Sequence, residues 1–417
     1  MTKKGLFTLV CLSLFLLLEV ESHAQKLAAH DTVAFSSNRN SVILPFHFIH
    51  NLIIIPVQIN DSPPLNFILD TGVKNILITH LYYTDSLNLN NTTEIEIKGL
   101  GTGDTLKAFY SQGNSLKMKG IAGENQDVYV LKEDIFHLSS RMGMPVHGII
   151  GYDIFKNFIV KINYSSKHLT LLRPDVKLKP PKRGEVYPLH LERDKAYIFA
   201  HVRQHNGDTI RVKLVVDTGA SHSLSLYLPS NSQLALPPKV MEAYLGRGLS
   251  GDINGKIGRI NSFSIGRHEL QNLPASYPDE ASIQAAMNIS DRNGNLGSDI
   301  LKRFTVIFDY PHSQMTLIPN KRYKEPFNYN LAGFEVGAPV IGMKFYEVAH
   351  VVDGSPAHAV GLMRGDQILS INGQSCFEMS LSDILGYLEK GPGKKLKLRL
   401  YRENEVKYVV LTLQNRI

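Results

Sequence analysis

The 417-residue sequence contains only two cysteines, and their positions exclude a disulfide framework. Cys11 lies in an N-terminal apolar segment that is predicted to be removed, which leaves Cys376 without an intramolecular partner. We expect Cys376 to be a small buried apolar residue and the fold to depend on its hydrophobic cores. Apolar residues make up 43% of the chain and charged residues 20%, as in globular proteins that bury several cores.

Long apolar runs are also scarce, because only one stands out and it lies at the N-terminus. Two lysines precede the apolar run 6–18, and Ser22-His23-Ala24 resembles a small-x-small cleavage site. The alternative, a membrane anchor, is less favoured because the run is short for a full span and two acidic residues end it. Residues 1–24 are therefore predicted to be a signal peptide, with export to the periplasm, the cell surface or the medium.

The sequence lacks the signatures of metal and nucleic-acid sites. Sixteen histidines are scattered without a His-Glu-x-x-His motif or a tight cluster. The net charge is +7, but the basic residues form neither a clustered patch nor a recognition motif. We therefore predict no metal, no cofactor and no nucleic-acid partner.

Short β-rich runs are what the sequence does contain. From residue 41 onward, segments such as Leu52–Ile59 and Leu65–Leu69 are rich in Ile, Val and Leu and are separated by turn residues. Two short helices are expected at 81–87 and 133–139, and residues 25–40 are expected to be loose. The proline-rich segment 173–188 is interpreted as a linker or a connecting strand.

An internal repeat dominates the chain. The run Phe67–Leu69 ends in Asp70-Thr71-Gly72, and the run Leu214–Val216 ends in Asp217-Thr218-Gly219. A given tripeptide is expected about once in several thousand positions at average residue usage. Two copies, each behind an apolar run, indicate a duplicated unit.

Two further landmarks follow each aspartate in the same register. Glycine-rich segments at 99–104 and 246–252 begin at the same distance from Asp70 and Asp217, and the later segments around Asp153 and Asp299 agree to within one residue. Ordered landmarks that recur in this way indicate a duplicated domain.

These landmarks resemble those of the aspartic peptidases of the pepsin and retropepsin type, and they are closer to the retropepsin-like bacterial domains. The resemblance covers roughly residues 42–320. It implies a mainly β fold class with two acid-protease β-barrel lobes, at 41–178 and 185–322, that form one bilobal peptidase. Because one chain supplies both aspartates, a dimer is not required for catalysis.

The resemblance implies that Asp70 and Asp217 are catalytic. Two carboxyl groups about 3 Å apart cannot both ionise easily, so the pair holds one proton. The charged member can then take a proton from a bridging water while the protonated member donates to the scissile carbonyl. The pair titrates as a unit, so the sequence leaves open which aspartate is the acid.

Other residues of the two copies would support this pair. The residues implied to hold the dyad are Thr71, Gly72, Thr218, Gly219 and Ser221. The glycines implied to form mobile flaps over an extended peptide are Gly99, Gly101 and Gly103 in the first copy and Gly246, Gly248 and Gly251 in the second.

One departure separates the two copies. Ala220-Ser221 follows Gly219 as in retropepsin-like loops, whereas Val73-Lys74 follows Gly72. Lys74 beside Asp70 could lower its pKa and upset the sharing of a proton, although an alternating strand pattern favours an outward orientation. The alternative hypothesis is therefore a non-catalytic peptide-binding or scaffolding protein on the same fold. A weaker one has each half dimerising with another chain.

The C-terminal residues 331–417 resemble a bacterial PDZ domain. The resemblance rests on Ser355-Pro356-Ala357, on Gly365-Asp366-Gln367-Ile368-Leu369 and on a closing hairpin at 396–413. It implies binding of an extended peptide, at its C-terminus or internally, along a sheet edge. The expected carboxylate-binding loop is Leu331-Ala332-Gly333-Phe334. The alternative is a module that only packs against the peptidase.

The sequence thus predicts an exported aspartic endopeptidase that acts on a peptide or protein substrate, with a PDZ domain that recruits substrate or gates access to it.

Overall fold

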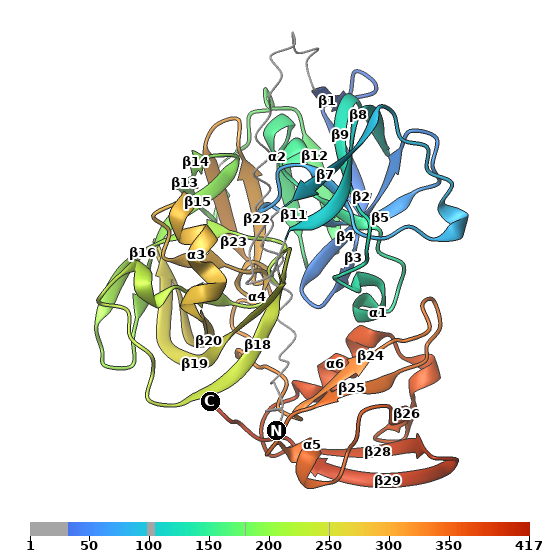
Figure 1. Ribbon diagram of the computed structural model, residues 1–417. Helices are drawn as coiled ribbons and strands as arrows, with labels where there is room; N and C mark the ends of the chain where they lie inside the picture. The colour runs from blue at the N-terminus through green and yellow to red at the C-terminus, as the bar shows by residue number, and fades with distance from the viewer. Residues whose placement is uncertain (1–31, 98–104, 180, 250) are drawn as a thin grey trace.

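The computed structural model describes residues 32–97, 105–179, 181–249 and 251–417, and these residues form four β-sheets with short helices (Figure 1). The predicted mainly β fold class is confirmed. In the described part of the chain, no helix is long and apolar enough to cross a membrane.

The first sheet forms most of the N-terminal lobe. Its strand order is β1-β9-β6-β10-β5-β4-β8-β7, and β3 pairs with β4 at one side. The strands are β1 (Thr32–Phe35), β3 (His47–Ile49), β4 (Leu52–Ile59), β5 (Leu65–Leu69), β6 (Ile76–Ile78), β7 (Thr92–Ile97), β8 (Leu106–Met118), β9 (Ile121–Leu131) and β10 (Gly148–Ile150).

The C-terminal lobe repeats this arrangement in its own sheet. Its order is β14-β15-β16-β21-β17-β20-β19-β18. The strands are β14 (His190–Glu192), β15 (Lys195–Arg203), β16 (Thr209–Val216), β17 (Leu224–Leu226), β18 (Val240–Gly248), β19 (Gly251–Ile265), β20 (His268–Pro278) and β21 (Gly294–Leu296).

A third sheet joins the two lobes, and both contribute strands to it. Its order is β13-β23-β22-β11-β12-β2, and the lobes meet where β11 pairs antiparallel with β22, with Ile162 opposite Val306. The strands are β2 (Ser41–Pro45), β11 (Ile159–Asn163), β12 (His168–Leu172), β13 (Glu185–Pro188), β22 (Phe304–Asp309) and β23 (Gln314–Pro319). Because the backbone ladder runs across the lobe boundary, the two lobes are held in one relative position.

The fourth sheet belongs to the C-terminal module. Its order is β24-β25-β26-β28-β29, with β27 paired to β26, so β24 is an edge strand. The strands are β24 (Phe334–Gly337), β25 (Glu347–Val351), β26 (Gln367–Ile371), β27 (Gln374–Ser375), β28 (Lys395–Arg402) and β29 (Glu405–Thr412). The helices α5 (Pro356–Ala359) and α6 (Leu381–Leu388) complete the module.

Local sequence explains these elements. In β4 both faces are covered, so Leu52 to Ile55 are all buried and the strand reads as a continuous apolar run. In β28 one face is solvated, and buried and exposed residues alternate. Helix α6 begins at a capping box in which Ser380 and Asp383 satisfy each other's backbone amides.

Three local expectations differ from the structure. The stretch 25–40 was expected to be loose, yet β1 pairs with β9 because Val33 and Phe35 can join the core. The helix expected at 81–87 is only the 3₁₀ turn η1 (Tyr83–Asp85), and the helix expected at 133–139 lies later, as α1 (Leu138–Met142). Helix α3 (Glu280–Ile289) was not predicted.

The C-terminal module shares a hydrophobic core with the C-terminal lobe. The lobe contributes Ala243, Leu245, Ile253 and Ile257 from the β18–β19 hairpin and Ile283 from α3 to the same cluster that holds the core of the module. In Figure 1 the module lies below both lobes, with α6 close to α1 and β18 running toward it. The hairpin and the module therefore pack as one unit.

Candidate active site

The two aspartates stand at equivalent points of the two lobes. Asp70 directly follows β5, which pairs in parallel with β10, and Asp217 directly follows β16, which pairs in parallel with β21. Gly151 follows β10, where an added Cβ would meet the Asp70 carbonyl oxygen at 1.8 Å. Only glycine therefore permits this close approach beneath the first loop.

The two threonines lock the loops together across the lobe boundary. Thr71 Oγ1 accepts from the Thr218 amide and donates to the Val216 carbonyl oxygen, at 3.0 and 2.6 Å. Thr218 Oγ1 accepts from the Thr71 amide and donates to the Leu69 carbonyl oxygen, at 3.0 and 2.9 Å. Both hydroxyls are buried and fully used, so the relative position of the aspartates is fixed by four hydrogen bonds.

The two carboxyl groups lie against each other. A Cβ added to Gly219 would stand 2.1 Å from Asp70 Oδ2, and one added to Gly72 would stand 3.0 Å from Asp70 Oδ1 and 3.6 Å from Asp217 Oδ1. Each also accepts from the amide two residues later, Gly72 to Asp70 at 2.6 Å and Gly219 to Asp217 at 3.1 Å. The carboxyls therefore lie close enough to act as one pair, and Asp70 Oδ2 is a buried oxygen without a hydrogen-bond partner among the described residues.

Burial sets the protonation of this pair. Asp70 is 0% exposed and Asp217 is 2% exposed. Burial and the charge of Asp217 raise the pKa of Asp70 well above its usual value. Burial also raises the pKa of Asp217, but the Asn295 amide and the nearby Lys195 and Arg292 oppose that rise.

Three polar side chains of the C-terminal lobe thus favour an ionised Asp217. Asn295 Nδ2, on β21, donates to Asp217 Oδ2 at 2.7 Å. Lys195 Nζ, at the start of β15, donates to the Gly72 carbonyl oxygen at 2.8 Å. Burial lowers the pKa of Lys195 to about 8, against the pull of both aspartates. Arg292 is 3% exposed and lies over the Tyr227 ring.

The equivalent positions of the N-terminal lobe are all apolar. Strands β10 and β21 occupy equivalent places in the two lobes, so Ile149 corresponds to Asn295. Val146 and Arg292 lie three residues earlier and therefore also correspond. The hairpins β3–β4 and β14–β15 are also equivalent between the lobes. Leu52 is the first residue of β4 and Lys195 the first of β15, so these two residues correspond. The three apolar counterparts are completely buried, so none of them stabilises a charge on Asp70, whose ionised form is favoured only by the Gly72 amide and by Lys195 among the interactions of the described residues.

Lys74 does not reach the dyad. Its ammonium is 60% exposed and pairs with Asp194 of the other lobe at 2.8 Å. The second copy has a matching contact, in which Asn51 donates to the carbonyl oxygen of Ser221 at 2.8 Å. In both copies the residue four positions after the aspartate, Lys74 or Ser221, thus contacts the hairpin turn of the opposite lobe. Lys74 makes this contact through a charge pair.

The glycine-rich segment of the second copy forms the tip of the β18–β19 hairpin. Gly248 pairs with Gly251, and Gly246 and Gly251 have φ values of 141° and 123°. Leu249 at the tip is 1% exposed and belongs to a hydrophobic cluster of the N-terminal lobe that includes Val73. The hairpin thus reaches across to the loop of Asp70. The predicted flap glycines Gly99, Gly101 and Gly103 lie outside the described residues.

Comparison with protein-family models agrees with this geometry. A model of aspartyl proteases matches residues 55–154 and again 202–300, and a PDZ-domain model matches residues 347–402. The chain contains two aspartyl protease repeats and a PDZ domain. No curated protein matches it. The resemblance inferred from the sequence is therefore confirmed.

The expected carboxylate-binding loop of the PDZ domain is occupied by a neighbouring side chain. Asn330 Oδ1 accepts from the amides of Ala332 and Gly333, each at 3.1 Å, and Asn330 Nδ2 donates to the Phe334 carbonyl oxygen at 2.6 Å. Leu331 donates its amide to the Leu388 carbonyl oxygen. In this structure three of the loop amides are thus already satisfied within the PDZ domain.

Among the described residues, no group of three or more His, Cys, Asp or Glu side chains is placed to hold a metal ion. Cys376 is buried in the PDZ domain, and burial raises the pKa of its thiol to about 12. At neutral pH it is a protonated, inert core residue.

Asn295, Lys195 and Arg292 were not foreseen from the sequence. A signal for Asn295 was present, because it interrupts the apolar run of its repeat where the first copy has Ile149. Arg292 had the same kind of signal, because it stands where the first copy has Val146. Lys195 has none, since the hairpin that joins it to Asp217 is longer than its counterpart in the first copy and hides the alignment.

Proposed function

We propose that the protein is an exported aspartic endopeptidase that hydrolyses peptide bonds with a water activated by Asp70 and Asp217. The observation that carries this proposal is the threonine-locked pair of adjacent, buried carboxyls. Buried carboxyls in contact are expensive unless they share a proton, and a shared proton is what acid–base hydrolysis needs. Export rests on the predicted signal peptide at residues 1–24.

The asymmetry of the lobes supports one division of roles. Asp70, in apolar surroundings, holds the proton and donates it to the scissile carbonyl as the tetrahedral intermediate forms. Asp217 is held ionised by the Asn295 amide and the nearby cations, and it takes the proton from the attacking water. Because the pair is coupled, the pH profile reports both groups together.

Substrate entry requires the hairpin to move. The dyad is buried, and Leu249 at the tip of the β18–β19 hairpin packs in a cluster of the opposite lobe. The same hairpin shares its core with the PDZ domain. We therefore propose that the PDZ domain recruits peptide substrate and also influences the opening of this flap.

The deciding experiment is cleavage of a peptide library by the protein across acid to neutral pH. Asp70→Asn and Asp217→Asn should each lower kcat/KM by roughly 10²–10⁴, the usual contribution of a positioned acid or base. Asp208→Asn, in the exposed turn between β15 and β16, is the matched control and should retain activity.

Two outcomes would overturn the proposal. Cleavage that survives both substitutions would remove the dyad from the mechanism. Absence of cleavage by the unmodified protein at every pH would favour the scaffolding alternative. Export is tested separately by sequencing the N-terminus of the secreted protein, which should begin at Gln25.

A further inference from the structure

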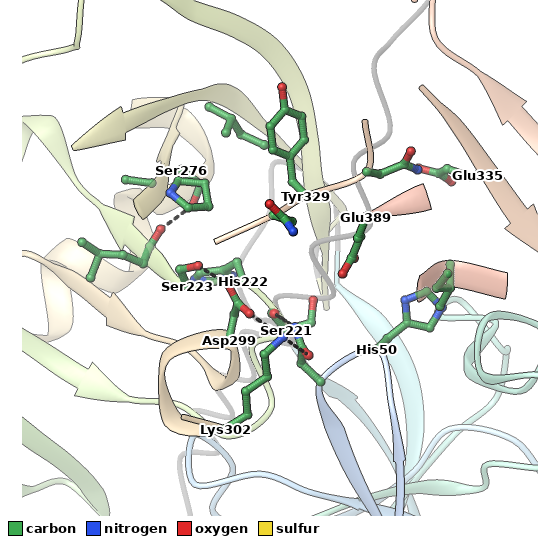
Figure 2. Close-up of a pocket in the computed structure, with 18 of the residues that line it drawn as sticks. His50, Ser221, His222, Ser223, Ser276, Asp299, Lys302, Tyr329, Glu335 and Glu389 are labelled. Atoms are coloured by element: carbon green, nitrogen blue, oxygen red, sulfur yellow. Dashed lines mark hydrogen bonds and ion pairs between the residues drawn. The ribbon is translucent and has the colours of Figure 1, made fainter. Parts of the chain in front are cut away.

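A cavity of about 110 Å³ lies where the two lobes and the PDZ domain meet. Figure 2 shows the polar residues that surround it, which come from all three parts of the chain. The N-terminal lobe supplies His50 and Asn51, the C-terminal lobe supplies Ser221 to Leu224 and Lys302, and the PDZ domain supplies Glu335, Val336, Leu385 and Glu389.

One wall of this cavity is an unpaired sheet edge. Strand β24 pairs only with β25 among the described strands, and α6 supplies the facing wall through Leu385. The Ser140 carbonyl oxygen of α1 accepts from the Ala338 amide just beyond the strand, so the N-terminal lobe closes that end. The remaining edge offers backbone groups to an extended segment.

The groove is closed to a free carboxylate at its loop. Asn330, which also lines the cavity, already accepts hydrogen bonds from the Ala332 and Gly333 amides. A C-terminal carboxylate would have to displace this amide oxygen. A segment that passes along β24 without a chain end needs no such displacement, so an internal segment fits better.

Two acidic side chains give the cavity a preference for charge. Glu335 Oε1 is a buried oxygen without a hydrogen-bond partner among the described residues. Glu389 lies at the mouth of the cavity, exposed to solvent and without an ion-pair partner among them. Burial raises the pKa of Glu335 to about 8, although the Arg141 charge opposes that rise. The Glu335 carboxyl therefore lacks a full counter-charge.

The cations nearby are already engaged. Lys302 pairs with Asp299 at 2.6 Å and donates to Asn51 at 3.0 Å. Arg141 of α1 is also near, but its charge only partly opposes the effect of burial on Glu335. One more positive charge between Glu335 and Glu389 would supply the counter-charge that these carboxyls lack.

We propose that this cavity binds a lysine or arginine side chain of an extended internal peptide segment that pairs with the edge of β24, with Glu335 and Glu389 as the residues that recognise its charge. The segment would lay alternate side chains against the groove wall formed by Val336 and Leu385.

The site lies within reach of the catalytic pair. Ser221 lines the cavity and is four residues from Asp217, a separation of at most about 14 Å along an extended chain. If the proposed peptidase function holds, the bound segment belongs to the substrate, and a basic residue lies about four to six positions from the cleaved bond.

Binding is measured on the full chain carrying Asp70→Asn and Asp217→Asn, so the result does not depend on catalysis. The probes are fluorescein-labelled, amidated decapeptides of alternating valine and serine with one central lysine, norleucine or glutamate. Fluorescence anisotropy should show that the lysine probe binds at least about tenfold more tightly than the norleucine probe, as expected for a buried charge pair.

The charge preference should depend on the two acids. Glu335→Gln with Glu389→Gln should abolish the preference for lysine, whereas Glu403→Gln with Glu405→Gln, in the exposed β28–β29 turn, should retain it. Ionisation of Glu335 should also strengthen lysine binding as the pH rises from about 7 to 9, against the fixed charges of Arg141, Lys302 and Asp299. Norleucine binding should not change over this range.

Three results would overturn the proposal: equal affinity for lysine and norleucine probes, a lysine preference that survives the double glutamine variant, or no binding of any probe. If a probe with a free C-terminal carboxylate binds more tightly than the same probe with an amidated C-terminus, the inference that the site binds an internal segment is wrong. Mapping cleavage sites with the active protein then tests the position of the basic residue. Failure of cleavage alone would leave the binding result intact and count only against the peptidase function.

Discussion

The two lobes share one backbone plan but surround their aspartates with opposite chemistry. Asp70 is flanked by positions occupied by Leu52, Val146 and Ile149, all apolar and buried. The same positions around Asp217 carry Lys195, Arg292 and Asn295, as the strand register shows. The two copies thus share the strands and threonines that hold the carboxyls. They differ in the side chains around each carboxyl, and that difference makes the two aspartates chemically unequal.

This divergence has a physical consequence for the shared proton. A carboxylate is stabilised by a donated hydrogen bond and by nearby positive charge, and it is destabilised by an apolar environment. Both effects favour the proton on Asp70 in the mechanism proposed above, while the Lys195 charge lowers the pKa of both carboxyls. A symmetric pair would leave the proton equally shared between the two.

The largest effect is expected from making Asn295 like its counterpart. Asn295→Ile removes the hydrogen bond to Asp217, so the pKa of Asp217 rises and the acidic limb of the kcat/KM profile moves to higher pH. Loss of a hydrogen bond to a charged group costs about 1.5–3 kcal/mol, which is roughly tenfold to hundredfold in kcat/KM below the optimum. The measurement is a pH–rate profile.

The position of that limb separates catalysis from folding, because misfolded protein lowers the amplitude without moving the pKa. Ser225→Ala, a buried neighbour on β17, is the matched control. An acidic limb that stays in place in Asn295→Ile would contradict the proposed role of the amide.

A smaller effect is expected from Lys195→Leu, which installs the residue found at the equivalent position of the first lobe. The lysine charge lowers the pKa of both aspartates, so its removal should move both limbs of the profile to higher pH. The height of the optimum should change by less than about tenfold. The comparison variant is Lys74→Leu, which removes an exposed lysine on the same side and should leave both limbs unchanged.

A profile of Lys195→Leu that matches the unmodified protein would show that solvent screens the ammonium from the dyad. A single moving limb would instead assign Lys195 to only one of the two aspartates.

The smallest effect is expected at the contacts that each loop makes with the opposite hairpin. Lys74→Ala breaks the pair with Asp194, whose members are 60% and 28% exposed. Exposed ion pairs contribute about 0–1 kcal/mol, so the free energy of unfolding should fall by no more than that. Urea denaturation measures it. If the free energy of unfolding falls by well over about 1 kcal/mol, the Lys74–Asp194 pair is not an ordinary surface contact.

Much of the fold was predictable because it depends on local pattern. The apolar runs before Asp70 and Asp217, the glycines behind them and the hairpins of the PDZ domain are visible in the sequence, since strands and turns carry short-range signals. Strand β1 and helix α3 were missed because their stability comes from tertiary packing, which overrides weak local preference.

The candidate site was only partly predictable. Asp70, Asp217, Thr71 and Thr218 follow from the repeated tripeptide, and the structure places them together. Lys195 and Asn330 could not be foreseen, because each acts through one contact with a residue that its own sequence neighbourhood does not specify. The concern raised by Lys74 disappears once Asp194 is seen to hold it.

By itself, the sequence determined the duplication, the identity of the paired aspartates and the presence of a peptide-binding module, because these depend on residue types at fixed spacing. The tertiary structure alone decided which carboxyl lies in apolar surroundings, that the β18–β19 hairpin and the PDZ domain share a core, and that Glu335 and Glu389 face one cavity. Burial and electrostatic environment are set by residues distant in the chain, and only folding brings those residues to the two aspartates.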